Sequence, residues 1–330
     1  MFTEILDLVG LLVFGFILLV KGADWFVEGA AGIANKLGVP QLVIGLTIVA
    51  MGTSAPETAI SLTASFQESA ALAVGNIVGS NIMNVLVILG ITAIITPLAV
   101  QKSTIKYEMP FVIFISVLFP ILGLGLGLTK GLAAPDGVLS RIDGIILLLL
   151  FVIYLAYLFY MVKHGQAEAE EIPGEKNANW LKLLALLAVG LTLIILGSDY
   201  TIRSATKLAK LFGMSERFIG LTIVAFGTSL PELATCIAAG LKKNADIAIG
   251  NIVGSNIFNM LFVGGVSAVI KPVTYQGGFF IDSAVCLFTA ALLYLSVFFN
   301  KKRVLNRFSG TLMIVCYAAY FAYLVMKSGN

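Results

Sequence analysis

Two copies of one short motif place a carboxylate, two hydroxyls and a proline inside long apolar segments. The motif G-T-S-x-P-E occupies residues 52–57 and 227–232. Thr and Glu are four positions apart and Ser and Glu three apart, so on a helix these side chains project from nearly the same face. Proline lacks an N–H and clashes with the carbonyl four residues back, here that of Gly52 or Gly227. We therefore expect a broken turn whose carbonyls are free, so that it offers hydroxyl, carbonyl and carboxylate oxygens together.

The two carboxylates of this motif are candidates for a cation site. Glu57 and Glu232 are the only acidic residues that lie well inside apolar segments without a basic partner nearby in the sequence. A carboxylate at mid-bilayer is a functional candidate by default. Two carboxylates about 6 Å apart repel by roughly 3 kcal/mol at an effective dielectric of 20, so they must be protonated or share cations. The surrounding oxygen ligands suit calcium, magnesium or sodium, and an irregular site built from two helix breaks fits calcium better than magnesium.

A second polar motif, G-N-I-V-G-S-N-I-x-N, follows each copy at residues 75–84 and 250–259. Its polar side chains recur every four positions and so form one stripe along a helix: Asn76, Ser80 and Asn84, and Asn251, Ser255 and Asn259. Its glycines have the G-x-x-x-G spacing that permits close approach of helices: Gly75 and Gly79, and Gly250 and Gly254. Asn76 and Asn251 are as well explained by joining helices as by binding.

The composition indicates that these motifs lie in a membrane. Of 330 residues, 59% are hydrophobic and only 12% charged, against roughly 25% charged in a soluble domain. This excludes a cytosolic enzyme, and a net charge of +3 is too small for a nucleic-acid surface. The single histidine, His164, lies in the most polar stretch, and the three cysteines show no zinc or disulfide spacing. The chain is predicted to be an all-α integral membrane protein.

Ten segments are apolar and long enough to span a bilayer. They are residues 5–22, 40–65, 70–97, 108–128, 142–163, 180–200, 216–240, 245–270, 278–299 and 308–326. We expect the first to remain in the mature protein, because Glu4 and Asp7 are unlike the basic start of a signal peptide. Loops that fall inside when the N-terminus is outside hold more Lys and Arg than the others, so both termini are predicted to be extracellular.

The two motifs belong to an internal repeat. Residues 45–98 and 220–273 align at a constant offset of 175 without a gap, and 29 of the 54 aligned positions are identical. The same offset aligns Asp24 with Asp199, which we interpret as anchors at span ends. Five spans precede the second copy, so it enters the membrane from the opposite side, an arrangement that places a binding site near the midplane. We expect a five-helix repeat at 1–163, a polar cytoplasmic linker at 164–179 and a second five-helix repeat at 180–330.

The paired motifs resemble the alpha repeats of the sodium/calcium exchangers, within the calcium/cation antiporter superfamily, and the compact chain resembles the prokaryotic members. The resemblance implies that Glu57 and Glu232 are central carboxylates used by calcium and sodium in turn, with the carbonyls of Thr53 and Thr228 completing the calcium site. Asn84 and Asn259 would face its middle. It also implies sodium ligands in both halves: Ala50, Ser54 and Ser80, and Ala225, Ser229 and Ser255. Some relatives, including potassium-dependent ones, have Asp at position 259, and Asn259 here argues against potassium co-transport.

The resulting hypothesis is an electrogenic sodium/calcium antiporter of the cell membrane, working by alternating access, with calcium and sodium as transported ions. We expect the lipid bilayer to be a partner of the chain. We expect no cofactor, no enzymatic activity, no binding of nucleic acid and no obligate protein partner. Proton/calcium exchange on the same scaffold stays open, because protons need only the carboxylates. An ion channel is disfavoured because one chain already holds both halves, and an intramembrane enzyme because the spans hold no His, Asp dyad or H-E-x-x-H.

Overall fold

The chain folds into a bundle of helices, as the composition predicts. The computed structural model describes residues 2–66, 70–124, 136–164, 179–212, 225–276 and 279–328. Its first half contains α1 (Phe2–Leu37), α2 (Gln41–Ile44), α3 (Ala50–Thr53), α4 (Ala55–Phe66), α5 (Ala70–Met83), α6 (Gly90–Ile95), α7 (Met109–Gly123) and α8 (Arg141–Lys163). Its second half contains α9 (Trp180–Leu211), α11 (Ala225–Thr228), α12 (Leu230–Leu241), α13 (Ala245–Phe258), α14 (Gly264–Ile270), α15 (Phe279–Phe298) and α16 (Arg307–Ser328).

Several spans contain wider π-helical turns. These are η1 (Gly45–Val49), η2 (Asn84–Leu89), η3 (Thr104–Glu108) and η5 (Asn259–Val263). The turns η2 and η5 begin at Asn84 and Asn259, the last asparagines of the two copies of the second motif. Single π turns inside α-helices are rare and occur frequently at functional sites.

Eight helices among the described residues are long and apolar enough to cross a membrane, and a bent pair makes a ninth span. The pair joins Gln41–Thr53 to Ala55–Leu62 at an angle of 49°. These nine match nine of the ten predicted segments. The tenth, 216–240, is represented by α11 and α12, and its residues 216–224 lie outside the described part.

The first and sixth spans are longer than predicted. The sequence prediction ended them at residues 22 and 200, but α1 has 36 residues and α9 has 32. A 36-residue helix is about 54 Å long, well beyond the roughly 30 Å hydrocarbon core, so it must tilt or extend past it. The prediction was wrong because a search for apolar residues stops at charges such as Asp24 and Arg203. The helices continue past them because these side chains are exposed or half-exposed.

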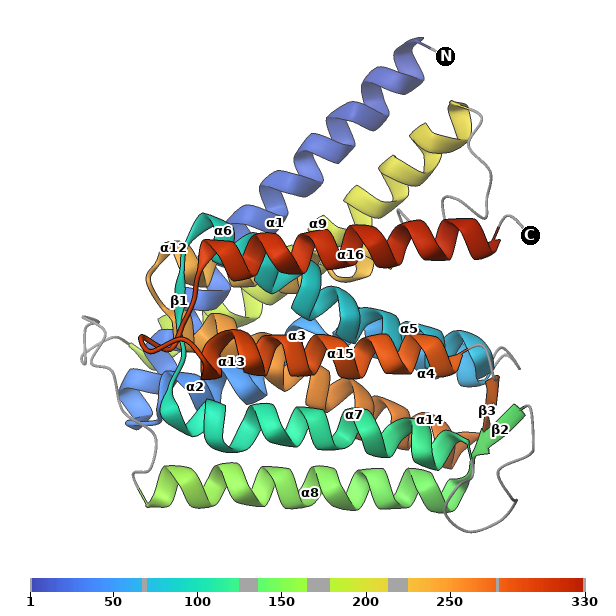
Figure 1. Cartoon of the computed structure of the whole chain (residues 1–330). Helices are drawn as coiled ribbons and strands as arrows, with labels where there is room; N and C mark the ends of the chain where they lie inside the picture. The colour runs from blue at the N-terminus through green and yellow to red at the C-terminus, as the bar shows by residue number, and fades with distance from the viewer. Residues whose placement is uncertain are drawn as a thin grey trace.

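The helices α1 and α9 pack along each other in antiparallel directions, obliquely to α7, α8 and α15 (Figure 1). A Cβ on Gly22 would lie 2.8 Å from the carbonyl oxygen of Gly190, and one on Gly197 would lie 2.7 Å from that of Gly15. Gly15 and Gly190 are equivalent at the offset of 175, as are Gly22 and Gly197, so the contact is reciprocal. Equivalent helices that run antiparallel across a membrane are the defining feature of an inverted-topology repeat.

Two short antiparallel ladders connect the loops at the two ends of the bundle. At one end β1 (Leu98–Ala99) pairs with β4 (Val304–Leu305), and at the other β2 (Asp136–Leu139) pairs with β3 (Val273–Gln276). Figure 1 shows these ladders at opposite ends of the helices. Each ladder therefore ties a loop of the first half to a loop of the second half.

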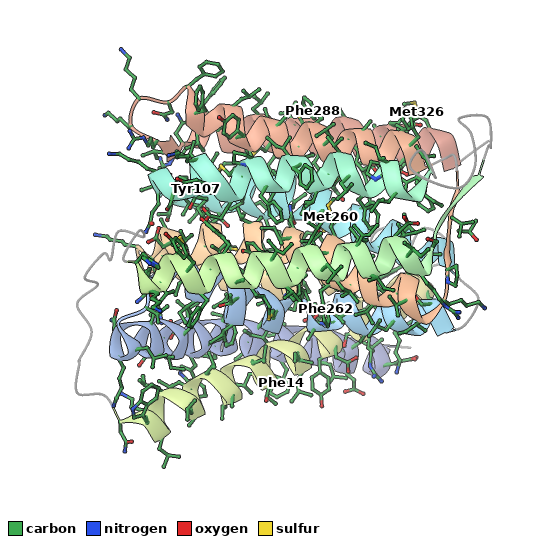
Figure 2. The ribbon with its side chains drawn as sticks, turned by 90° about the horizontal axis from the view of Figure 1, so that it is seen from below. Phe14, Tyr107, Met260, Phe262, Phe288 and Met326 are labelled. Carbon is green, nitrogen blue, oxygen red and sulfur yellow. The ribbon has the colours of Figure 1, made fainter. Side chains whose placement is uncertain are left out.

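The helices that carry the two motifs form the interior. The 18-residue windows of Ala73–Ile95 and Ala245–Ile270 are 83% buried, whereas those of the other spans are mostly exposed to the surroundings of the bundle. Met260 lies between helices in Figure 2 and is 2% exposed, while Phe14, Phe288 and Met326 project outward. Large apolar side chains that face outward are what a lipid-facing surface requires. The polar motifs are thus enclosed by protein, and apolar helices surround them.

The glycines of the second motif approach neighbouring helices closely in the second copy. A Cβ on Gly250 would lie 2.8 Å from the carbonyl oxygen of Leu42, and one on Gly254 would lie 2.6 Å from that of Leu46, so α13 approaches α2 and η1 as closely as predicted. A Cβ on Gly79 would meet no described atom within 4 Å. The residues equivalent to Leu42 and Leu46 are Arg217 and Leu221, which lie outside the described residues, so close packing at Gly79 stays a prediction.

Candidate cation site

Each copy of G-T-S-x-P-E breaks its helix at the serine. Ser54 has φ −81° and ψ 13°, between the end of α3 and the start of α4. Ser229 has φ −89° and ψ 5°, between α11 and α12. The prolines follow two residues later, in the first turn of α4 and α12, where their missing N–H has no helical partner to lose. The sequence therefore ends one helix and begins another within a single turn, twice.

Each break places a glutamate at the start of one helix and backbone carbonyls at the end of another. Glu57 and Glu232 lie in the first turn of α4 and α12. The partial positive charge at a helix N-terminus stabilises a carboxylate there. Thr53 and Thr228 are the last residues of the preceding helices, and the carbonyls at a helix C-terminus carry partial negative charge that attracts cations. Each break thus presents a carboxylate and a negative helix end side by side.

Contacts between the two halves bring the breaks together. Ser54 Oγ donates to Glu232 Oε1 at 2.8 Å, and Ser229 Oγ donates to Glu57 Oε1 at 3.3 Å. These bonds are equivalent under the offset of 175. Because Ser54 lies three residues before Glu57, the two carboxylates are brought into one site, although the sequence separates them by 175 residues.

Four buried side-chain oxygens of the two motifs have no hydrogen-bond partner among the described residues. They are Oε2 of Glu57, Oε2 of Glu232, Oδ1 of Asn84 and Oδ1 of Asn259. All four residues are at most 2% exposed, and each oxygen is an acceptor when the carboxylates are ionised. Buried polar atoms in native proteins almost always have partners. These four oxygens form two symmetric pairs. Oxygen ligands of this kind are what a hard cation such as calcium or sodium requires.

The asparagine amides are held by bonds across the two-fold relation. Asn84 Nδ2 donates to Asn256 Oδ1 at 3.0 Å, and Asn259 Nδ2 donates to Asn81 Oδ1 at 3.2 Å. Asn81 Nδ2 also donates to the carbonyl oxygen of Asn256 at 3.1 Å, and Asn256 Nδ2 to that of Asn81 at 3.4 Å. With their nitrogens held, Asn84 and Asn259 keep their unpartnered carbonyl oxygens in a fixed orientation.

Asn81 and Asn256 were missed as important residues by the sequence reasoning. They are equivalent at the offset of 175 and contact each other, so they lie on the pseudo-two-fold axis itself. Residues that contact their own symmetry equivalents are the signature of such an axis. The signal was present in the sequence as an intact G-S-N in both motifs, but nothing in the spacing distinguishes an axial asparagine from a ligand.

One of the carbonyls predicted to be free is occupied by protein. Pro231 releases the carbonyl of Gly227, which accepts a hydrogen bond from Ser198 Oγ at 2.8 Å. The expectation that this carbonyl is available to a ligand is therefore wrong, because α9 supplies a hydroxyl to it. The residue equivalent to Ser198 in the first half is Ala23, which has no hydroxyl. The two halves thus differ at this point.

The structure places the remaining predicted ligands as follows. Ser255 Oγ lies 3.0 Å from Ser54 Oγ and donates to the carbonyl oxygen of Ala50 at 3.4 Å. Ser80 is buried in α5. Thr228 is buried with its hydroxyl near Glu57. Ala225 begins α11 beside the site, and its side chain lies outside the described part.

The two first asparagines of the stripes join neighbouring helices. Asn76 Nδ2 donates to the carbonyl oxygen of Glu57 at 3.1 Å and to Ser61 Oγ at 2.8 Å. Asn251 accepts from Thr53 Oγ1 at 3.0 Å and donates to Cys236 Sγ at 3.4 Å. Both asparagines therefore position the broken turns from the adjacent helix, which is the joining role that the sequence left open beside binding.

The structure reveals a buried carboxylate that the sequence did not single out. Glu108 in η3 is 1% exposed, and its Oε1 accepts a hydrogen bond from the hydroxyl of Tyr157 on α8. It was missed because it falls at the edge of a predicted span. Asp24 and Asp199 form ion pairs with Lys242 and Arg203, which is consistent with anchoring.

Within the described residues neither central glutamate forms an ion pair with Lys or Arg, and no group of three or more His, Cys, Asp and Glu is arranged around a metal position. The negative charge of the site therefore comes from two carboxylates alone. An uncompensated pair of buried charges requires cations or protons.

Comparisons with known proteins agree with this arrangement. The family model described as sodium/calcium exchanger protein matches residues 8–160 and 182–326. A relative named putative antiporter CaxA, from Alkalimonas amylolytica, is 40% identical over 323 residues, covering 95% of this chain and 97% of the relative. The sodium/calcium exchanger MaX1 of Methanosarcina acetivorans is 30% identical over 346 residues, with 95% and 97% covered.

A solved structure of the sodium–calcium exchanger NCX_Mj, soaked with 10 mM Na⁺ and zero Ca²⁺, superposes with a TM-score of 0.81. It is 32% identical and covers 96% of this chain and 99% of its own. The exchangers among these proteins are transporters and not enzymes. The matched family model, the full-length relatives and the shared fold lead to one conclusion: this chain belongs to the sodium/calcium exchanger family.

Proposed function

We propose that this chain exchanges calcium for sodium across the cell membrane by alternating access. The observation that carries the proposal is the set of four buried, unpartnered oxygens contributed symmetrically by Glu57, Asn84, Glu232 and Asn259. Oxygen ligands without nitrogen or sulfur favour calcium and sodium over zinc or copper. Membership of the exchanger family supports the same reading.

Calcium would be held by both carboxylates together with the carbonyls of Thr53 and Thr228. Calcium takes roughly six to eight oxygens at irregular geometry. The helix ends at the two breaks supply carbonyl dipoles on opposite sides of the carboxylates, which suits a doubly charged ion. Asn84 and Asn259 would complete the middle of the site with their amide oxygens.

Sodium would use the same carboxylates and the small side chains and backbone around them. The proposed sodium ligands are Ala50, Ser54 and Ser80 in one half, and Ala225, Ser229 and Ser255 in the other. The short contacts of Ser54 with Glu232 and with Ser255 support a role at the same centre. Because both ions need the same carboxylates, they compete, and exchange follows without a separate coupling device.

The charge of the site favours electrogenic transport. Calcium neutralises two carboxylates alone, and so do two sodium ions. A third sodium ion would leave one positive charge to move with the loaded carrier. Such a charge responds to the membrane potential by about 2.3 kcal/mol per 100 mV.

Flux through reconstituted protein tests the proposal. Proteoliposomes loaded with sodium are diluted into sodium-free buffer with labelled calcium, with and without a potassium–valinomycin potential. We expect calcium entry that requires internal sodium and responds to the imposed potential. No sodium-dependent entry would end the sodium/calcium reading, and entry indifferent to the potential would end the electrogenic one.

Proton/calcium exchange is a second candidate, favoured by one observation. The two central carboxylates have no basic partner among the described residues, and protons neutralise such a pair as well as cations do. This reading predicts calcium uptake driven by a pH gradient with sodium absent throughout. The same liposomes, prepared with an internal acid buffer, separate the two readings.

The proposal includes an orientation and a division of the chain. The ends of α8 and α15 that carry Lys163, Lys301 and Lys302 would face the cytoplasm, and the ends of α1 and α16 that carry the termini would face outward, because basic loops remain inside. In Figure 1 the two termini lie at the same end of the bundle. The first repeat would comprise 1–163 and the second 180–330, joined by 164–179, most of which lies outside the described residues.

A further inference from the structure

A basic pocket lies at one end of the bundle, away from the central site. It has a volume of about 470 Å³ and is formed by the segment before α7 and the end of α15 with the loop after it. Four of its lining side chains are cationic and two are aromatic: Lys102, Lys106, Lys301 and Arg303, with Tyr294 and Phe298. Tyr107, the neighbour of Lys106, marks this end in Figure 2, where several nitrogen-tipped side chains project.

The backbone of the pocket is fixed by hydrogen bonds between the two loops. The β1–β4 ladder pairs Leu98 with Leu305, and the N–H of Val100 donates to the carbonyl oxygen of Arg303 at 2.9 Å. Asn300 Nδ2 donates to the carbonyl oxygen of Val304 at 2.7 Å. The cationic side chains are therefore presented from an ordered turn and not from a free loop.

Arg303 adopts a backbone conformation that is costly for its residue type. Its φ is 51°, in the left-handed region that favours glycine and asparagine. Strain of this kind persists only where the surrounding structure imposes it, and it occurs often at ligand clamps. Here it turns the chain so that Lys301 and Arg303 line the same pocket as Lys102 and Lys106.

The four cations have no anionic partner in the part of the chain that the structure describes. The ion pairs found there join Arg203 to Asp199 and Lys242 to Asp24. The ammonium of Lys106 lies 5.0 Å from the ring centre of Tyr107, a cation–π contact with a neutral side chain that does not cancel its positive charge. Four like charges around one pocket repel one another, so an anion bound there would relieve the repulsion.

The repeat offers an internal comparison. The span formed by η3 and α7, whose start lines the pocket, is equivalent to α15 at the offset of 175. The positions equivalent to Lys102 and Lys106 are Gly277 and Ile281, and neither is charged. The fold therefore does not require lysines at these two positions, because their equivalents in the second half are uncharged.

We propose that this pocket binds the phosphate headgroup of an anionic phospholipid. The pocket lies at the ends of membrane spans, at the level where headgroups meet water, and basic pockets between transmembrane helices are suited to such headgroups. Tyr294 and Phe298 line it beside the cations, as aromatic side chains do at membrane interfaces. Phe298 is 55% exposed, so an apolar surface for the acyl chains adjoins the charges.

The test compares two variants that lose the same number of charges. The pocket variant carries Lys102→Gln, Lys106→Gln and Lys301→Gln. The matched control carries Lys163→Gln, Lys182→Gln and Lys302→Gln, which are exposed lysines at the same end of the bundle and do not line the pocket. Full-length protein in non-ionic detergent is titrated with phosphatidylglycerol and with phosphatidylcholine, and bound lipid is counted by native mass spectrometry.

We expect the wild-type protein and the control to bind one phosphatidylglycerol at least tenfold more tightly than phosphatidylcholine. The pocket variant is expected to lose this preference, because each basic side chain near an anionic headgroup strengthens binding by about fivefold. An equal loss in the control and the pocket variant would overturn the proposal, since surface charge in general would then explain it.

A third titration separates a lipid from a soluble anion. Inorganic phosphate and glycerol phosphate are added to the wild-type protein before phosphatidylglycerol. We expect neither to displace the lipid at concentrations a hundredfold above it, because they lack acyl chains. Displacement at equal concentration, or absence of any lipid preference in the wild-type protein, would refute a phospholipid site. Circular dichroism of each variant checks that all of them are folded.

Discussion

Replacing Glu57 by glutamine tests the central carboxylate pair most directly. The substitution keeps the size of the side chain and leaves an oxygen for the 3.3 Å contact from Ser229 Oγ. It removes one of the two negative charges of the site, and the described residues offer no third carboxylate there to replace it. A calcium ion bound to the variant would keep one uncompensated positive charge in the protein interior.

The size of the effect follows from the burial of Glu57, which is 2% exposed. Removing one partner of a buried pair of opposite charges costs about 3–5 kcal/mol, and here the pair is the Glu57 carboxylate and the bound calcium ion. At about 1.4 kcal/mol per factor of ten, calcium affinity should fall by roughly two to three and a half powers of ten. The initial rate of sodium-driven calcium uptake, measured in proteoliposomes at the calcium concentration that half-saturates the wild-type protein, should therefore fall to background.

Glu108→Gln provides the matched control. Glu108 is also a buried carboxylate in a membrane span, at 1% exposure, but it contacts Tyr157 and not the central site. We expect this variant to keep at least half of the wild-type rate. Thermal unfolding in detergent checks that both variants fold. If Glu57→Gln transports at the wild-type rate, or if Glu108→Gln alone abolishes transport, the assignment of the central pair is refuted.

Three further predictions follow from single contacts. Ser54→Ala removes the 2.8 Å donor to Glu232, and we expect sodium-driven uptake to fall at least tenfold while calcium/calcium exchange continues; equal loss of both activities would contradict a sodium-specific role. Asn81→Ala removes a donor to the carbonyl of Asn256 and an acceptor for Asn259. The loss should destabilise the protein by about 2–6 kcal/mol and lower its melting temperature in detergent. An unchanged melting temperature would show that these bonds contribute little. Gly190→Ala places a Cβ 2.6 Å from the backbone nitrogen of Phe26 and should destabilise the α1–α9 pair by about 1–3 kcal/mol, while Gly10→Ala, which meets no described atom within 4 Å, should leave the melting temperature unchanged.

The broad architecture could be predicted because it depends on patterns that survive without packing information. The repeat of residues 45–98 in 220–273 preserves polar and helix-breaking positions that apolar segments do not share by chance. The prolines predicted a broken turn in each motif, and the structure places the breaks at Ser54 and Ser229, two residues before the prolines. The lengths of the apolar segments predicted nine of the spans, because any helix that crosses a bilayer needs about 20 mostly apolar residues.

The lengths of α1 and α9 could not be predicted, because they depend on which direction each charged side chain faces. Asp24 interrupts the apolar pattern, yet it lies on an exposed side of α1 and pairs with Lys242, which is 218 residues away in the sequence. Hydropathy averaged over a stretch of sequence does not distinguish one face of a helix from another. It therefore ends a span at a charge that the folded helix accommodates.

The details of the site depend on contacts between the halves, which spacing does not encode. Ser198 occupies the carbonyl that Pro231 releases, and only the packing of α9 against α11 reveals it. The π turns that start at Asn84 and Asn259 likewise have no local sequence signal. Asn81 and Asn256 could be identified as axial only after the two halves were placed in contact.

The position of Asn81 and Asn256 has a mechanical consequence. Exchanging the roles of the two halves maps their mutual bonds onto themselves, so this contact can act as a pivot that stays closed while the rest rearranges. The serine bonds at the cation site exchange in the same way, but they are less alike than the asparagine bonds: the one from Ser54 is 2.8 Å long and its counterpart from Ser229 is 3.3 Å long. Exchanging the two halves would therefore shorten the bond to Glu57 and lengthen the bond to Glu232.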